Sequence, residues 1–339
     1  MWACSSIAST FPKCLTTFLF LYTGITTVLY VEFIPFGIVL ILIGASIVLN
    51  LYTYFKIIRV GAGSSTEFPD LKIANLEAAE QGLEFPPKFL TQRSVTLKRN
   101  GRFRFCRECV VWKPDRCHHC SACNKCHLKM DHHCPWFAVC IGFRNQKYFI
   151  QFLLYALTYS VLVFFFTGAD LFIWFRSRRY EHEVINLSLL VVWLLSVIIT
   201  ISVAAFTGHS IYLITKNQTV IEMYEWNNYK SNMNILDESR GTITSIDTNM
   251  FDLGSASRNW ESVMGETWLE WLLPIQAYAQ VKNRHTLDES GLYFRVNGNM
   301  QGQVSGSMIL QEQLMRRLTP RSSYGDNELR PPDMLFEVN

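Results

Sequence analysis

The sequence predicts an all-α membrane protein in which four transmembrane helices carry a small cytosolic, zinc-bound Cys-rich domain between the second and third spans. The composition is the first observation behind this prediction, because 49% of the 339 residues are hydrophobic and only 17% are charged. That balance is too apolar for an ordinary soluble pair of domains. The second observation is that eight of the ten cysteines fall between the second and third apolar stretches, at spacings typical of zinc ligands.

Four apolar stretches are long enough to cross a bilayer, since about 20 helical residues span its hydrocarbon core of roughly 30 Å. They cover residues 15–31, 35–54, 148–173 and 185–207. The first stretch has no strongly basic leader and runs almost directly into the second. We therefore expect it to remain as a membrane span rather than to be removed as a signal peptide.

The chain is expected to divide into five units along its length. These are residues 1–54 with the leader and the first two spans, 55–147 with a connector and the Cys-rich domain, 148–214 with the third and fourth spans, 215–280 as a cytosolic C-terminal domain, and 281–339 as a polar tail. Within the connector, residues 75–82 predict a short helix that stops ahead of Pro86 and Pro87. The tail is expected to be disordered or loosely attached.

The distribution of basic residues predicts the orientation in the membrane. About half of the Lys and Arg residues lie between the second and third spans, which places this segment in the cytosol. Arg176, Arg178 and Arg179, between the third and fourth spans, point weakly the other way. Thiolate clusters persist as metal ligands in a reducing cytosol and would tend toward disulfides in a lumen. With four spans, both termini are then also expected in the cytosol.

The Cys-rich segment contains the ligand pattern C-x2-C-x9-H-x6-C twice, in two copies that interleave. The first copy is Cys106, Cys109, His119 and Cys126, and the second is Cys120, Cys123, His133 and Cys140. Three thiolates and one imidazole complete a tetrahedral structural zinc and leave no open position for a catalytic water. Few residues here have the periodicity to build a core without metal, so two structural Zn²⁺ ions are predicted to hold the domain together.

Two cysteines of the segment, Cys117 and Cys134, are left over by this pattern. Cys134 stands where a third copy would begin, but the residue three places on is Phe137. Beside Cys134 lie His132, which the pattern also leaves unused, and Asp131. His132 could take the thiol proton while Asp131 holds the imidazole in the required tautomer, which makes a nucleophile and its base. The alternative is that Asp131 and His132 are solvated loop residues and Cys134 is an inert packed thiol.

The position of Cys134 near the third span favours the nucleophile. A thiolate at a membrane surface is suited to attack the thioester of a long-chain acyl carrier while the hydrocarbon stays in the apolar phase. Burial of such a chain contributes about 0.8 kcal/mol per methylene. The sequence thus favours an acyl-transfer site at the bilayer face.

The run from Cys106 to Cys140, with Asp131-His132-His133-Cys134 at its centre, resembles the DHHC family of protein S-acyltransferases. The resemblance extends from the first span to about residue 275. The matching positions outside the centre are Lys113, Pro114, Arg116, Gly142, Phe143, Asn145, Lys147, Tyr148, Phe149, Thr219, Glu222, Asn249, Phe251, Leu253, Gly254, Asn259, Trp260 and Gly265. Around the centre, the residues following Cys134 are most similar to the fungal vacuolar members of the family.

The resemblance implies a two-step reaction through a thioester. Cys134 would be acylated by palmitoyl-CoA and would then pass the acyl group to cysteines of cytosolic or membrane-associated proteins. The likeness to vacuolar members implies the vacuolar membrane, with the Golgi or another endomembrane as the alternative. It also implies substrates with membrane-proximal cysteines, some of them myristoylated. The lipid bilayer is the other expected partner, and no nucleic acid is expected.

Four further residues are candidates for contacts with acyl-CoA. Lys113 and Arg116 could meet the phosphates of coenzyme A, and their alternative is a solvated basic face toward an anionic leaflet. Trp136 could line the mouth of an acyl cavity, and core packing is its alternative. Tyr159, inside the third span, could limit the acyl chain length, or it could simply face lipid or pack between helices.

Thr219, Glu222 and Asn249 are expected to support the site, although Thr219 and Glu222 could instead only cap the helix after the fourth span. The sequence departs from the family pattern at two places. Ala138 and Val139 stand where the family commonly has an Asn just before its last zinc Cys. Val220 replaces a Thr that in the family lies close to the catalytic Asp.

Two other functions were weighed against acyl transfer. A membrane-anchored zinc module acting as a ubiquitin-ligase-like adaptor would need interleaved zinc sites, but it has no use for a spare nucleophile. A transporter should carry paired ionisable residues near the membrane midplane. Beyond Asp170 and His209, near the span ends, the spans show almost none.

Overall fold

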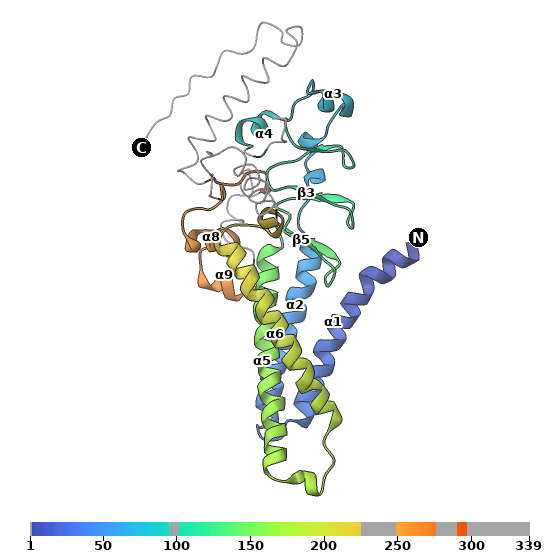
Figure 1. Ribbon diagram of the computed structural model, residues 1–339, viewed down its shortest axis with the longest axis vertical. Helices are drawn as coiled ribbons and strands as arrows, with labels where there is room; N and C mark the ends of the chain where they lie inside the picture. Colours follow the sequence, from blue (N-terminus) through green and yellow to red (C-terminus); the bar gives the residue numbers. More distant parts are fainter. Residues whose placement is uncertain (1, 95, 97–101, 225–248, 276–289, 297–339) are drawn as a thin grey trace, which may run out of the picture.

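The computed structural model describes residues 2–94, 96, 102–224, 249–275 and 290–296, and four long helices dominate it (Figure 1). These helices are α1 Trp2–Tyr30, α2 Phe36–Val60, α5 Gln146–Arg176 and α6 Leu187–Thr215. All four contain stretches long and apolar enough to cross a membrane, which confirms the four predicted spans. Each extends beyond the predicted range at one end or at both, because the helices continue past the purely apolar residues into polar ones.

The order of the helices places the Cys-rich domain at one end of the bundle. α2 begins after Pro35 and stops at Gly61, whose φ of 64° is a conformation that glycine adopts readily. The loop between α5 and α6, with its short 3₁₀ helix η3 (Arg179–Glu181), lies at the opposite end (Figure 1). The end of α2, the start of α5 and the end of α6 therefore meet the Cys-rich domain together.

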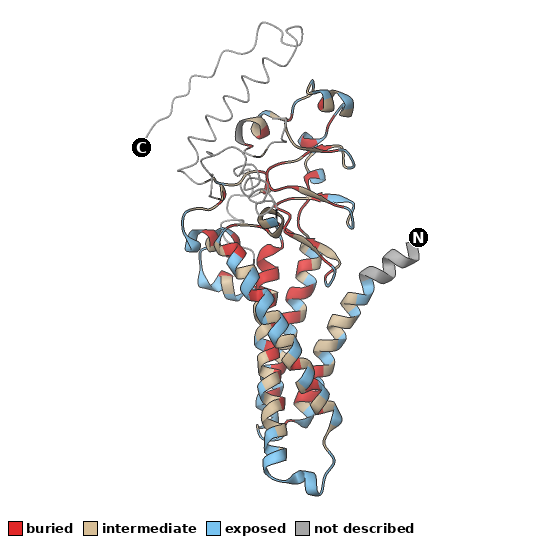
Figure 2. Ribbon diagram, in the orientation of Figure 1, coloured by how far each residue is buried: buried red, intermediate tan, exposed pale blue. Residues whose placement is uncertain are grey.

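α5 is the central helix of the bundle. It packs along α2 on one side and along α6 on the other. In the half of the bundle far from the Cys-rich domain, Val39 and Ile43 of α2 are buried against Tyr159 and Val163 of α5. Figure 2 shows that buried residues of α2 and α5 gather where these helices meet the Cys-rich domain, whereas their outer faces stay exposed. The exposed apolar faces are those expected to contact lipid.

Three short antiparallel hairpins form the Cys-rich domain. They pair β1 (Phe105–Cys106) with β2 (Val111–Trp112), β3 (His118–Cys120) with β4 (Lys125–His127), and β5 (His132–Cys134) with β6 (Val139–Ile141). The turns share one conformation, since Val110, Asn124 and Ala138 all have positive φ, at 53°, 50° and 54°. Each lies four residues after Cys106, Cys120 or Cys134. The repeat in the sequence is therefore also a repeat in backbone geometry.

Ala138, where the family commonly has an Asn, adopts the left-handed backbone conformation. The departure from the family pattern is therefore expected to affect stability. A left-handed residue with a Cβ costs roughly 1–2 kcal/mol unless it is Gly or, to a smaller extent, Asn. We expect Ala138→Asn to raise the free energy of unfolding by about 0.5–1 kcal/mol. Thermal unfolding of the zinc-loaded protein measures this. Ala122→Asn is the control, because Ala122 is exposed in the second turn and is not among the described positive-φ residues; an equal gain from both changes would contradict the explanation.

The connector before the hairpins contains short helices. They are η1 (Ser65–Glu67), η2 (Pro69–Leu71), α3 (Leu76–Gln81) and α4 (Lys88–Arg93). The Asn75 side chain caps α3 by accepting from two backbone N–H groups, and Gly82 ends it in the left-handed conformation. The helix predicted at residues 75–82 is thus confirmed.

Two helices after α6 lie against the spanning helices. They are α8 (Ala256–Met264) and α9 (Trp268–Leu272). The Gln151 side chain, buried on α5, donates to the carbonyls of Glu270, Trp271 and Leu273 at 2.9, 3.0 and 2.7 Å. These carbonyls lie at the end of α9 and have no further turn of helix to satisfy them. Gln151 therefore fixes α9 beside α5.

Part of the tail returns to the Cys-rich domain. Leu292 is buried with Leu71 and Trp112 in the core of the connector and first hairpin. This differs from the expectation of a loosely attached tail at residues 281–339. The remaining residues of that range, outside 290–296, lie outside the described residues.

Candidate active site and metal centres

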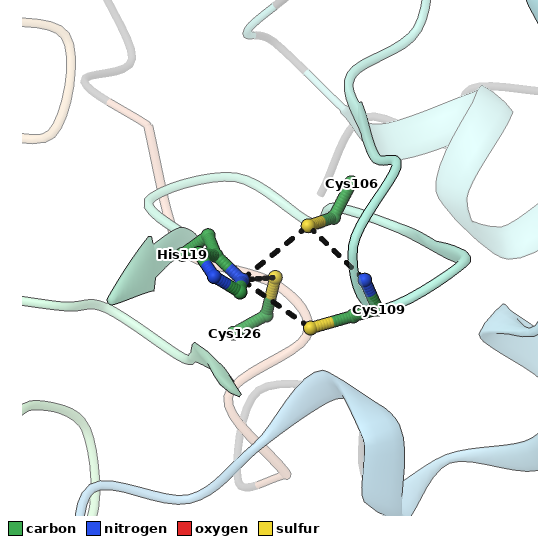
Figure 3. A group of neighbouring side chains, drawn as sticks. All are labelled: Cys106, Cys109, His119 and Cys126. Atoms are coloured by element: carbon green, nitrogen blue, oxygen red, sulfur yellow. Dashed lines mark hydrogen bonds between the residues drawn. The ribbon is translucent and has the colours of Figure 1, made fainter. Parts of the chain in front are cut away.

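The first Cys/His group combines two hairpins. Cys106 ends β1 and Cys109 lies in the turn that follows, whereas His119 and Cys126 are directly opposite each other on β3 and β4. Figure 3 shows the four ligand atoms turned toward a common point. The Sγ atoms of Cys106, Cys109 and Cys126 lie 3.5, 3.3 and 3.8 Å from Nδ1 of His119. Such separations suit a tetrahedral ion about 2.3 Å from each sulfur and about 2.0 Å from the nitrogen.

The second group repeats this construction one hairpin further on. His133 and Cys140 face each other on β5 and β6, whereas Cys120 ends β3 and Cys123 lies in the turn that follows it. The three sulfurs lie 3.6, 3.3 and 3.7 Å from Nδ1 of His133, in the order Cys120, Cys123, Cys140. The structure thus brings the eight predicted ligands together in two groups of four, each able to hold a metal ion.

The electrostatics of the groups fit a cation at their centres. Burial, together with the neighbouring sulfurs of Cys126 and Cys106, raises the pKa of Cys109 to about 12. Burial, together with the neighbouring sulfurs of Cys120 and Cys123, likewise raises the pKa of Cys140. Thiols this hard to ionise become thiolates when a divalent cation binds them. The donor set of three sulfurs and one imidazole is that of structural zinc.

Cys134 ends β5 just as Cys120 ends β3, yet it belongs to neither group of metal ligands. Phe137 occupies the position that a second ligand would take. Its buried ring instead packs against Tyr54 and Phe149, with centroids 4.9 and 6.0 Å apart. Cys134 is therefore a thiol at a ligand position of the repeat that has no partners for a metal among the residues that the structure describes.

Asp131 and His132 lie immediately before this thiol and are joined to each other. Nδ1 of His132 donates to Oδ2 of Asp131 at 3.0 Å, and the Val220 N–H donates to Oδ1 at 2.7 Å. Nε2 of His132 is buried and has no hydrogen-bond partner among the residues that the structure describes. Burial lowers the pKa of His132, but the hydrogen bond to Asp131 and the nearby Cys134 thiol outweigh it and raise this pKa to about 9.

Two aromatic rings hold the His132 imidazole from the bundle side. Phe149 of α5 and Phe206 of α6 meet it edge to face, with centroids 5.3 and 6.3 Å away. Sequence reasoning did not identify Phe206, because it is one of many apolar residues in a continuous apolar run. Nothing in its spacing distinguishes it from a lipid-facing residue.

An apolar cavity of about 640 Å³ opens beside Cys134 and runs down between α1, α5 and α6. Its lining on α5 extends from Phe149 to Val163, which is about 21 Å along a helix that rises 1.5 Å per residue. Near the far end, the Tyr159 hydroxyl lies 2.7 Å from Oγ1 of Thr23 on α1. Trp136 is 57% exposed and lines the cavity near Cys134. The structure therefore brings Trp136 and Tyr159 together with the thiol on one cavity.

Arg116 is placed differently from the expectation. Its side chain is only 1% exposed, and it forms an ion pair with Glu222, with Nε 2.6 Å from Oε1. The guanidinium also donates to the side chain and the backbone carbonyl of Asn217, at 3.0 and 2.9 Å. A coenzyme A phosphate would have to compete with all of these acceptors. This arrangement argues against the expected contact and makes Arg116 a link inside the protein.

Lys113 is half-buried beside the first Cys/His group rather than on the cavity. Its charge, after burial and Arg104, is among the causes that lower the pKa of His118 to about 4. The structure thus separates Lys113 from the acyl cavity and places it on the outer part of the Cys-rich domain.

Thr219, Glu222 and Asn249 all lie after α6, with Glu222 in the helical turn that follows Thr219. The Thr219 hydroxyl accepts from the Glu222 N–H at 3.2 Å, and the Glu222 carboxylate accepts from the Thr219 N–H at 2.9 Å. This reciprocal pair is a capping box, so the first turn of helix begins at Val220. The Asn249 amide donates to the carbonyls of Lys216 and Asn217 at 2.6 and 3.3 Å. These residues therefore shape the backbone that offers the Val220 N–H to Asp131.

Comparison with known proteins agrees with this site. Residues 99–227 match the family described as DHHC palmitoyltransferase. Over 318 residues the chain is 50% identical to Palmitoyltransferase PFA3 of Saccharomyces cerevisiae, covering 94% of both chains. It is 47% identical to Palmitoyltransferase PFA3 of Kluyveromyces lactis, covering 92% of this chain and 96% of the relative. Palmitoyltransferase ZDHHC2 of Homo sapiens is 36% identical over 178 residues, 52% of this chain and 44% of the relative. The likeness spans nearly the whole chain, and the chain belongs to the DHHC palmitoyltransferase family.

Proposed function

We propose that this chain is a protein S-palmitoyltransferase in which Cys134 carries the acyl group as a thioester. The observation that supports this most strongly is the position of Cys134, outside both metal groups and on an apolar cavity that enters the membrane-spanning bundle. Asp131 and His132 beside it supply the base and its orienting carboxylate. A metal-binding adaptor would need none of these features.

In the first step, His132 takes the proton of the Cys134 thiol, and the pKa of His132 near 9 favours the resulting imidazolium. The thiolate attacks the carbonyl carbon of the acyl-CoA thioester. A new C–S bond forms to Cys134, the C–S bond to coenzyme A breaks, and the leaving thiolate takes the proton from His132. In the second step a cysteine of the protein substrate attacks the new thioester in the same way and releases Cys134.

The two metal groups support this chemistry without taking part in it. Zinc is the ion that their ligands fit best, and it would fix the hairpins because all four positions are filled by protein. His133 is a ligand and lies between His132 and Cys134. A bound ion therefore fixes the strand that presents the base and the nucleophile.

The cavity has the length that a palmitoyl chain needs. With C–C bonds of about 1.5 Å, an extended sixteen-carbon chain spans roughly 19 Å. The cavity lining on α5 covers about 21 Å from Phe149 to Val163. Tyr159 lines this cavity one helical turn before Val163, and we propose its ring as a limit on acyl chain length.

Shortening Tyr159 is therefore expected to admit longer chains. With Tyr159→Ala, the preference for an eighteen-carbon over a sixteen-carbon acyl-CoA should rise about tenfold, since two more buried methylenes contribute about 1.6 kcal/mol. Competition between the two donors in the acylation reaction measures this. Tyr155→Ala is the matched control, because Tyr155 lies one turn away on α5 and does not line the cavity. An unchanged preference in Tyr159→Ala would show that the chain ends elsewhere.

The position of the Cys-rich domain at one end of the bundle is the basis for the orientation that we propose. We propose that the Cys-rich domain, residues 215–280 and both termini face the cytosol, since the segment rich in Lys and Arg lies at that end of the bundle. Lys113, on the outer part of that domain, is the residue we propose for contact with coenzyme A phosphates.

The relatives named PFA3 support a fungal endomembrane, which we propose to be the vacuolar membrane. Substrates would offer cysteines held near the membrane, some of them beside a myristoyl group.

Labelled palmitoyl-CoA tests the function directly. Purified protein should form an adduct that neutral hydroxylamine removes, because hydroxylamine cleaves thioesters. Addition of an acceptor protein with a membrane-proximal cysteine should move the label to that protein. Absence of any adduct on zinc-loaded, folded protein would favour the adaptor instead.

A further inference from the structure

Residues 290–296 pack at a defined place on the Cys-rich domain. Leu292 is buried to 7% exposure in the core that contains Leu71 and Trp112. Gly291, at a φ of 77°, lies against the ring of Phe143 so closely that an added Cβ would come within 2.6 Å of it. A loosely adhering chain would not need a residue without a side chain at this point. The segment is therefore an integral part of the domain surface.

The same segment covers the Arg116 guanidinium. The ring of Phe294 lies 5.2 Å from Cζ of Arg116, and the ring of Phe251 lies 4.5 Å from it. The two rings also meet each other edge to face at 6.3 Å. A cation held against aromatic faces away from water is stabilised more than one at the surface. Phe294 thus helps to keep water away from the ion pair of Arg116 and Glu222.

Arg116 connects the two backbone segments that meet at Asp131. Its carbonyl accepts from the Met130 N–H at 3.0 Å, next to Asp131 in the chain. Its guanidinium holds Glu222 and Asn217, which lie on either side of Val220. The Val220 N–H is in turn the donor to Asp131, at 2.7 Å. A displacement of the Arg116 side chain would therefore move a hydrogen-bond donor of the site.

We propose that residues 290–296 act as an intramolecular clamp, in which Phe294 is a positioning residue that holds the Arg116–Glu222 ion pair closed and so keeps the Val220 N–H on Asp131. The proposal rests on the proposed role of Asp131 and His132 in acyl transfer. Its physical basis is that the ion pair and the hydrogen bonds around it are stronger in a dry environment. Without the ring, water would reach the guanidinium and loosen the segment at residues 217–222, which includes the first turn of the helix that begins at Val220.

Variants at Phe294 in the full-length protein test the clamp. In Phe294→Ala, the single-turnover rate of Cys134 acylation at saturating palmitoyl-CoA should fall about tenfold. The KM for palmitoyl-CoA should stay unchanged, because Phe294 does not line the cavity. Phe294→Tyr keeps an aromatic face and should retain the rate, whereas Phe294→Leu keeps apolar bulk only and should lose most of it. Phe85→Ala removes a similarly large ring from an exposed site on the connector and is the matched control.

A double-mutant cycle shows whether Phe294 acts through Val220. Val220→Pro deletes the N–H that reaches Asp131, and proline is tolerated there because Val220 is the first residue of its helix. Val220→Pro alone should lower the acylation rate. Adding Phe294→Ala to Val220→Pro should then lower the rate by less than twofold, because the link is already broken. A purely structural role of Phe294 would give independent, multiplying losses.

The expected results distinguish a failure of the clamp from a failure of the proposed role of Cys134. An unchanged rate in Phe294→Ala, or losses that multiply with Val220→Pro, would overturn the clamp even if acyl transfer by Cys134 is established. Zinc content and melting temperature identify a variant that has failed to fold, and Phe294→Leu and Phe294→Tyr then decide the question. Persistence of the hydroxylamine-sensitive adduct in Cys134→Ser would instead overturn the proposed role of Cys134 as the acyl carrier.

Discussion

Replacing Cys134 with serine is expected to abolish acyl-enzyme formation, by about a thousandfold or more, while the protein stays folded with two zinc ions bound. The change removes only the sulfur that neither metal group uses. A serine hydroxyl is a far weaker nucleophile toward a thioester than a thiolate, even with His132 and Asp131 beside it. Single-turnover incorporation of labelled palmitate measures the loss.

The control for this variant is Cys14→Ser. Cys14 is an exposed cysteine on α1 that belongs to neither ligand group and does not line the cavity. The rate of acylation of Cys134 should be unchanged in it. Incorporation by Cys134→Ser at the wild-type level would show that another residue is the nucleophile.

Cys120→Ser is expected to lower the zinc content from two ions per chain to one and to destabilise the Cys-rich domain by several kcal/mol, on the order of 5 or more. The ligand group that loses Cys120 also contains His133, which lies between His132 and Cys134. Loss of this ion should therefore also release the strand that carries the site, and acylation should fall with it. Elemental analysis and thermal unfolding measure the two effects.

Cys117→Ala gives the matched comparison within the same domain. Cys117 is fully buried and packs with Cys106 and Cys126, but it is outside both ligand groups. The Cys117→Ala protein should retain two zinc ions. Two ions in Cys120→Ser, or one in Cys117→Ala, would refute the interleaved ligand scheme.

Features with a local origin in the chain could be predicted from the sequence. The four spans were predictable because bilayer thickness fixes the length of an apolar helix. The two ligand groups were predictable because each draws on neighbouring hairpins, so their spacing is set by short turns. The repeat of the turn conformation at Val110, Asn124 and Ala138 follows from the same fourteen-residue offset.

Features that depend on contacts between distant segments could not be predicted. Arg116 and Glu222 are separated by 106 positions in the sequence, and an arginine in a basic element suits a phosphate contact as well as a buried ion pair. Only burial distinguishes these two roles. The donor from residue 220 to Asp131 is a main-chain N–H, so the Val220 departure from the family motif does not remove it.

The short apolar run at Leu292 and Phe294 had no periodicity to distinguish it from the polar sequence around it. Its role depends on packing contacts with the connector, Phe143 and Arg116. A tail that is polar on average can therefore contain one segment that belongs to the folded domain. Composition reports the average and cannot locate such a segment.

The most direct test of the account is to identify the residue that carries the acyl group. Full-length, zinc-loaded protein would be incubated briefly with palmitoyl-CoA, digested, and its acylated peptides sequenced by mass spectrometry. The account predicts that the rapidly formed, hydroxylamine-sensitive palmitate lies on Cys134. Palmitate on another cysteine, with an unmodified Cys134 in the same active sample, would contradict it.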